Sequence, residues 1–70
     1  MKVKYRGFEI EAVRDWNMLY TEKFIFESCI RLSDGMDFSS GPYPSEMTVR
    51  EVIADSKFGI DQLLDGDEEL

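Results

Sequence analysis

The chain contains no histidine, one cysteine and two prolines among its 70 residues. Histidine is the side chain that most often serves as a general base or metal ligand near neutral pH, so the commonest catalytic arrangements are excluded. The lone Cys29 cannot close a disulfide within the chain, which favours a reducing compartment. No apolar run approaches the roughly 20 residues of a membrane helix, and the opening "MKVKYRGFEIEA" lacks the apolar core of a signal peptide. These absences predict a cytoplasmic protein with no membrane partner.

The remaining reactive groups lack neighbours that would activate them. Cys29 lies in a strand-like segment without a nearby cluster of basic residues, which is typical of an inert structural thiol. The acidic end "DGDEEL" lacks the alternating ligands of a calcium-binding loop and is typical of a solvated tail. The sequence also has no glycine-rich phosphate loop. We therefore expect no metal, no cofactor and no enzymatic activity.

Negative charge is abundant and unevenly placed. The net charge is −7, with six Lys or Arg and five acids in residues 1–31 but two Lys or Arg and ten acids in residues 32–70. The first part therefore carries +1 and the second −8. A surface of this kind repels nucleic acid, because nucleic-acid binding depends on basic residues that neutralise phosphates. It attracts basic surfaces, which are common on nucleic-acid-binding proteins.

Alternating and helical patterns predict one domain over residues 1–70, of the α+β class. Three antiparallel strands over residues 3–14, 23–32 and 36–40 would form a meander, with Gly7 at a bend and Asp34-Gly35 in a tight hairpin turn. A helix over 49–64 would cover the apolar face of the sheet and precede an acidic tail over 65–70. In the first strand Phe8 and Ile10 would face inward. The outer face of the sheet would carry the following side chains: Glu9, Glu11, Ile25, Glu27 and Arg31.

The predicted helix is amphipathic and has a clear start. Thr48 and Glu51 match a capping box, in which each side chain satisfies a free amide group of the first turn. At 100° per residue the buried stripe consists of Val49, Val52, Ile53, Ile60, Leu63 and Leu64, with Ser56 inside it. Phe58 lies on the opposite side of the helix, surrounded by four acidic residues: Glu51, Asp55, Asp61 and Asp65.

An outward aromatic ring among carboxylates has three interpretations. In the first, Phe58 is an isolated exposed apolar residue, which is common on protein surfaces. In the second, the ring is the anchor of a recognition site and the acids attract a basic partner. In the third, the ring is buried in a homodimer, which a small core would favour.

The segment "DWNMLYTE" is the second candidate binding region. It reads as a mobile loop between the first two strands, yet it contains Trp16, Met18, Leu19 and Tyr20. These side chains either fold back over one end of the core or form a binding tip on a rigid scaffold. We count Trp16 and Tyr20 among the candidate partner-binding residues.

Three stretches of the chain together resemble a known group of proteins. "YRGFEIEA", "FESCIRLSDGMDFSSG" and "TVREVI" resemble small acidic proteins of phages and other mobile elements, in which a β-meander precedes one C-terminal helix. That genomic setting includes the anti-CRISPR proteins, some of which imitate DNA with carboxylates. The resemblance implies an inhibitor, and because the group shares no catalytic motif it carries over no functional residue.

The leading hypothesis is therefore a non-enzymatic inhibitor that binds a basic nucleic-acid-handling protein, such as the DNA-binding surface of a CRISPR effector complex, and binds no nucleic acid itself. The alternative is a small assembly or interaction module whose acidity serves solubility only. One version of this alternative is a homodimer.

Overall fold

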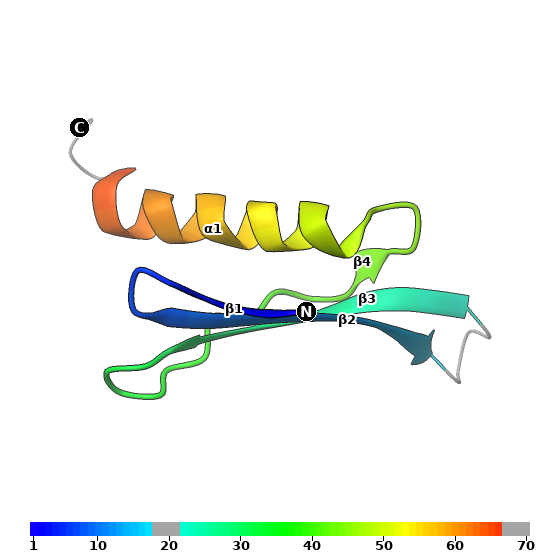
Figure 1. Cartoon of the computed structure of the whole chain (residues 1–70), viewed down its shortest axis with the longest axis horizontal. Helices are drawn as coiled ribbons and strands as arrows, with labels where there is room; N and C mark the ends of the chain where they lie inside the picture. Colours follow the sequence, from blue (N-terminus) through cyan, green and yellow to red (C-terminus); the bar gives the residue numbers. More distant parts are fainter. Residues whose placement is uncertain (18–21, 67–70) are drawn as a thin grey trace.

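The computed structural model describes residues 1–17 and 22–66, and it has the α+β architecture of an antiparallel sheet covered on one face by a helix (Figure 1). The sheet order is β1-β2-β3-β4, so strands that follow one another in sequence also pair. The elements are β1 (Lys2–Tyr5), β2 (Phe8–Asn17), β3 (Glu22–Arg31), β4 (Tyr43–Pro44) and α1 (Val49–Asp65). The predicted class and C-terminal helix are confirmed, and the sheet has a fourth, short strand that the sequence analysis did not predict.

The predicted first strand over 3–14 is in fact a hairpin. β1 pairs antiparallel with β2, and Tyr5 lies opposite Phe8 across a two-residue turn. The turn residues Arg6 and Gly7 have φ values of 50° and 84°. Positive φ at both central residues is the pattern of a type I′ turn, whose twist matches that of the flanking strands. Gly7 therefore reverses the chain rather than bending it, and arginine occupies a position where asparagine or aspartate is usual.

β2 and β3 form the long central hairpin of the sheet. Their register runs from Phe8 opposite Arg31 to Asn17 opposite Glu22. Asp15 and Trp16 therefore belong to β2 rather than to the predicted loop. Residues 18–21 lie outside the described part of the chain.

The predicted third strand over 36–40 is reduced to a single bridge. Arg31 and Met36 close a turn in which Gly35 adopts a φ of 74°, and Asp37 then forms an isolated antiparallel bridge with Ile30. Beyond the bridge, the Cys29 amide donates to the Ser39 hydroxyl at 2.9 Å instead of to a backbone carbonyl. A side chain thus takes over the ladder contact, and regular pairing stops.

β4 is the strand that the sequence analysis missed. Tyr43 pairs with Ile25 and Pro44 with Phe24 at the edge of the sheet. Proline is tolerated there because an edge strand leaves one row of amide positions unpaired. Pro44 therefore does not prevent a short strand at this edge of the sheet.

The core lies between α1 and the inner face of the sheet. Its buried apolar residues are Phe8, Ile10, Ala12, Ile25, Cys29, Val52, Ile53 and Ile60. The inward orientation of Phe8 and Ile10 is confirmed. For β3 the predicted orientation is wrong, because Ile25 is fully buried and Glu27 is 9% exposed, whereas Phe26 is 39% exposed.

The helix begins as predicted. The Thr48 hydroxyl accepts from the Glu51 amide at 3.0 Å, and the Glu51 carboxyl group accepts from the Thr48 amide at 2.8 Å. Arg14 holds the segment before the helix by donating to the carbonyl oxygens of Ser45 and Met47 at 2.8 and 2.9 Å. These contacts fix the position of the N-terminus of α1 relative to the sheet.

The buried stripe of α1 is shorter than predicted. Val52, Ile53, Ser56 and Ile60 are buried, whereas Leu63 and Leu64 are 47% and 46% exposed. Gly59 is not needed for close packing on the sheet, because a Cβ atom added there would meet no atom within 4 Å. Its absent side chain instead leaves open space beside the helix.

Candidate protein-binding surfaces

Five of the seven predicted binding residues lie on α1 and define what we call the acidic helix face: Glu51, Asp55, Phe58, Asp61 and Asp65. Phe58 is 63% exposed, so its ring is not buried by the rest of the chain. The helix runs without interruption from Val49 to Asp65 and thus presents the ring and the carboxyl groups together. The exposed position of Phe58 on the helix agrees with the helical spacing, and binding through this face stays a prediction.

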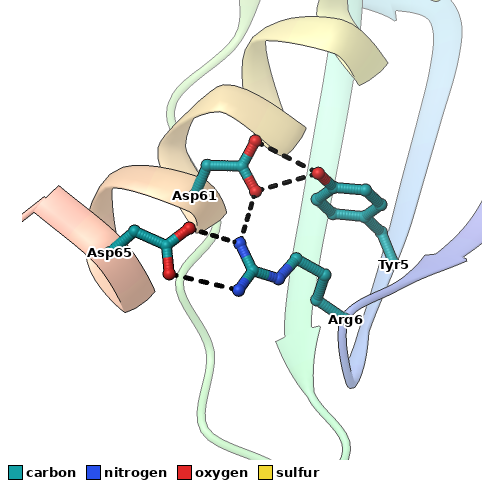
Figure 2. Close-up of polar contacts among 4 residues, drawn as sticks. All are labelled: Tyr5, Arg6, Asp61 and Asp65. Atoms are coloured by element: carbon teal, nitrogen blue, oxygen red, sulfur yellow. Dashed lines mark hydrogen bonds and ion pairs between the residues drawn. The ribbon is translucent and has the colours of Figure 1, made fainter.

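Two of these carboxylates are held by an arginine that the sequence analysis did not single out (Figure 2). The Arg6 guanidinium donates to Asp61 Oδ1 and Asp65 Oδ2, both at 2.8 Å, and to Asp65 Oδ1 at 3.2 Å. The Tyr5 hydroxyl donates to both oxygens of Asp61, at 2.8 and 3.1 Å. We call these four residues the Arg6 clamp.

The Arg6 clamp supplies what the end of α1 lacks. The last turn of the helix contains no basic residue, although its free carbonyl groups favour a cation there. Arg6 reaches this turn from the β1–β2 hairpin, and Lys57 Nζ lies 5.3 Å from the centre of the Tyr5 ring. The uncommon positive φ of Arg6 places its side chain beside the helix, so tertiary contacts explain an arginine in this turn.

The clamp changes the protonation of its members in consistent directions. Hydrogen bonds from Arg6 hold the pKa values of Asp61 and Asp65 below their usual 3.8. The hydrogen bond to Asp61 raises the pKa of Tyr5 above 10.0. A carboxyl group whose pKa is lower in the folded than in the unfolded chain stabilises the fold above the unfolded pKa, and this contribution is lost as the pH falls through the folded value.

We therefore expect the Arg6→Gln variant to differ from the wild type mainly above pH 4. The free energy of unfolding should be lower for Arg6→Gln at pH 7, and the difference should shrink as the pH falls below the unfolded value of 3.8 for the two aspartates. Urea unfolding at several pH values measures this difference. Lys4→Gln removes the same charge from the same hairpin and serves as the control. A difference that does not change with pH would contradict the electrostatic role of the clamp.

The other two carboxyl groups of the acidic helix face are bound to neutral donors. Glu51 accepts from the Thr48 amide, and Asp55 accepts from the Tyr43 hydroxyl at 2.9 Å. A neutral donor fixes the orientation of a carboxylate without cancelling its charge. With the single positive charge of Arg6 included, the acidic helix face carries three net negative charges, one fewer than its four acids suggest.

The remaining two predicted binding residues are not brought to this face by any described contact. Trp16 lies in β2 opposite Lys23, and its side chain lies outside the described part of the structure. Tyr20 also lies outside the described residues. Their role in binding stays a prediction.

A groove of about 270 Å³ opens between α1 and the segment that follows β3. The Ser56 hydroxyl donates to Glu27 Oε2 at 2.6 Å beside it, and the Ser40 amide donates to Glu27 Oε1 at 2.7 Å. This buried network joins β3, α1 and the 37–42 segment. Its signal in the sequence was Ser56, a polar residue inside the apolar stripe of the helix, which requires a buried partner.

Cys29 also borders the groove, and it points into the core rather than outward. Burial, together with the nearby Glu27 and Asp37 carboxyl groups, raises the pKa of its thiol above 9.0. A raised pKa lowers the fraction of reactive thiolate. The structure is therefore consistent with the inert thiol that the sequence predicts.

The opposite face of the sheet is the third candidate surface, and we call it the open sheet face. The described side chains on it belong to Lys2, Lys4, Glu9, Glu11, Val13, Asp15, Phe24, Phe26, Ser28, Ile30, Asp37 and Pro44. In Figure 1, α1 lies along one side of the sheet, and the described residues place no helix on the other. Val13 and Phe26 face each other across β2 and β3 and are 43% and 39% exposed. The predicted outer face contained Ile25 and Glu27 in place of Phe24 and Phe26, so its apolar centre was not predicted.

Neither a metal site nor a membrane helix emerges from the described residues. In the ranges 1–17 and 22–66, no three acidic or cysteine side chains gather in a way that would hold a metal ion. The helix in this part of the chain is too short and too polar to cross a bilayer.

No protein-family model, curated protein or solved structure matches the chain.

Proposed function

We propose that the protein is a non-enzymatic inhibitor that binds the basic surface of a nucleic-acid-handling protein through its acidic helix face. The observation that carries this proposal is Phe58, which at 63% is the most exposed large apolar side chain in the described part of the chain, set among four carboxylates. An aromatic ring provides a desolvated anchor that can stack on an arginine plane. The carboxylates attract and orient the basic partner.

The groups on this face are preorganised for binding. Asp55, Asp61 and Asp65 are each oriented by a hydrogen bond from another part of the chain. Fixed carboxylates lose less side-chain entropy on binding than free ones do. Arg6 forms ion pairs with Asp61 and Asp65 and offsets part of their charge. The carboxylates that imitate phosphates are therefore chiefly those of Glu51 and Asp55.

The resemblance to small phage proteins narrows the proposal to one kind of partner. In this form the protein is an anti-CRISPR DNA mimic that occupies the target-DNA site of a CRISPR effector complex in the host cytoplasm. It needs no cofactor and binds no nucleic acid itself. Its negative charge is suited to a basic channel that holds the sugar-phosphate backbone.

The test is competition between the protein and duplex DNA for a CRISPR effector complex. Addition of the wild-type protein should release labelled target DNA, and the effect should weaken between about 50 and about 200 mM salt because exposed charges are screened. The variant Phe58→Ala with Asp55→Lys should compete at least about 30-fold less well, the loss typical of one binding hot spot.

The matched control is Leu32→Ala with Glu46→Lys. It removes a similarly exposed apolar side chain, 50% exposed, and changes the net charge by the same two units away from the acidic helix face. It should compete like the wild type. Equal competition by both double variants, or DNA binding that excess protein leaves unchanged, would contradict the proposal.

The second candidate function is an assembly module in which the acidity serves solubility. The exposure of Val13 and Phe26 on the open sheet face favours it. It predicts self-association without any competition with DNA.

A further inference from the structure

The open sheet face has an apolar centre that a one-sided sheet does not need. Val13 lies opposite Phe26, and the next row of the same face places Phe24 opposite Pro44. We call these four residues the apolar cluster. In an antiparallel sheet covered on one side, outward positions are normally polar. Here the outward series of β3 is more apolar than its inward series, which contains Glu27.

Charge indicates what would cover this face. The ionisable side chains described on this face are Lys2, Lys4, Glu9, Glu11, Asp15 and, at the bridge to Ile30, Asp37. Two lysines and four carboxylates give these side chains a net charge of −2, against −7 for the whole chain. Contact between two copies through the acidic helix face would oppose three net negative charges on each copy, whereas contact through the open sheet face would centre on apolar side chains and bring together surfaces of lower charge that carry both signs.

The size of the face is sufficient for a dimer. Ten-residue strands at about 3.3 Å per residue, with a sheet about 15 Å wide, give a projected area of about 500 Å² per copy. Two copies would then bury at least about 1,000 Å², which is the lower range for a specific interface. A 70-residue chain also gains more than a larger one from such burial, because its own core is small.

We propose that two copies of this chain pack through their open sheet faces, with the apolar clusters in contact. Sheets stacked face to face lie about 10 Å apart with their strands within about 30° of each other. The result is four layers, helix-sheet-sheet-helix, in which α1 of each copy lies on the outside. This proposal does not depend on the inhibitor function. If both hold, the dimer presents two acidic helix faces on opposite sides and is bivalent.

Sedimentation equilibrium over a range of protein concentrations tests the dimer. The wild type should approach twice the 8.2 kDa of one chain as concentration rises. Phe26→Lys should raise the dissociation constant at least about 30-fold, as for a central hot-spot residue. Phe58→Lys makes the same chemical change on a more exposed ring of the acidic helix face and should leave the dissociation constant unchanged.

Two results would overturn the proposal. One is a wild-type protein whose measured mass stays at 8.2 kDa up to a protein concentration of about 1 mM. A dissociation constant above about 1 mM corresponds to a binding free energy weaker than about 4 kcal/mol. The other is a dimer that Phe58→Lys disrupts and Phe26→Lys does not. Circular dichroism shows whether Phe26→Lys is folded. If it is not, NMR signals of the wild type on dilution decide: those of Val13 and Phe26 should shift and that of Phe58 should not, and the reverse pattern would overturn the proposal.

Discussion

Replacement of Ile25 by aspartate is expected to unfold the protein, whereas the same replacement at the next residue, Phe26, is expected to leave a folded monomer. Ile25 has no exposed surface and contacts the core beneath α1. An ionised carboxylate there would lose its hydration without gaining a partner, at a cost of several kcal/mol. A chain of 70 residues is typically stable by only about 3.5–10 kcal/mol.

The neighbouring position has the opposite environment. Phe26 is 39% exposed on the open sheet face, so an aspartate at this position stays in water within one chain. Circular dichroism and urea unfolding of the two variants at pH 7 compare them directly. The chemical change is the same and the positions are adjacent, so composition and net charge cannot explain a difference. A folded Ile25→Asp variant with an unfolded Phe26→Asp variant would show that β3 has the reverse orientation.

This pair of residues also marks the limit of prediction from the sequence. Both faces of β3 alternate, and the series with Phe24, Phe26 and Ile30 is the more apolar one. Hydrophobicity alone therefore selects the wrong face. The structure places Glu27 inside because Ser56 and Ser40 donate hydrogen bonds to it. Such partners are distant in sequence, and an alternation pattern contains no information about them.

The sequence correctly predicted the features of α1 that depend on residues close together in the chain. The capping box of Thr48 and Glu51 fixes the start of α1, and the helical spacing places Phe58 on the exposed side. The Arg6-Gly7 turn was not predicted because arginine is uncommon at positive φ. Arginine occupies this position because it contacts Asp61 and Asp65, which are 55 and 59 residues away in the sequence. The acids of the predicted site lie on α1, as the helical spacing predicts, while the cation that contacts Asp61 and Asp65 comes from the β1–β2 hairpin.

Replacement of Glu27 by alanine is the second change with a large expected effect. Its carboxyl group accepts from the Ser56 hydroxyl at 2.6 Å and from the Ser40 amide at 2.7 Å. Both Glu27 and Ser56 are buried. A buried donor left without an acceptor costs about 1–3 kcal/mol, so the loss of both contacts should lower the free energy of unfolding by about 2–4 kcal/mol. Urea unfolding at pH 7 measures the change.

A set of variants separates hydrogen bonding from loss of side-chain volume at Glu27. Glu27→Gln keeps one carbonyl oxygen and nearly the same volume, and should lose less stability than Glu27→Ala. Adding Ser56→Ala to Glu27→Ala removes the unsatisfied hydroxyl, so the double variant should be more stable than the sum of the two single effects predicts. Strict additivity would mean that the two side chains do not interact.

Glu27 also accepts a hydrogen bond from the Ser40 amide, and this network attaches the 37–42 segment to β3 and α1. Loss of the Glu27 side chain should therefore increase hydrogen exchange in the 37–42 segment before the rest of the sheet is affected.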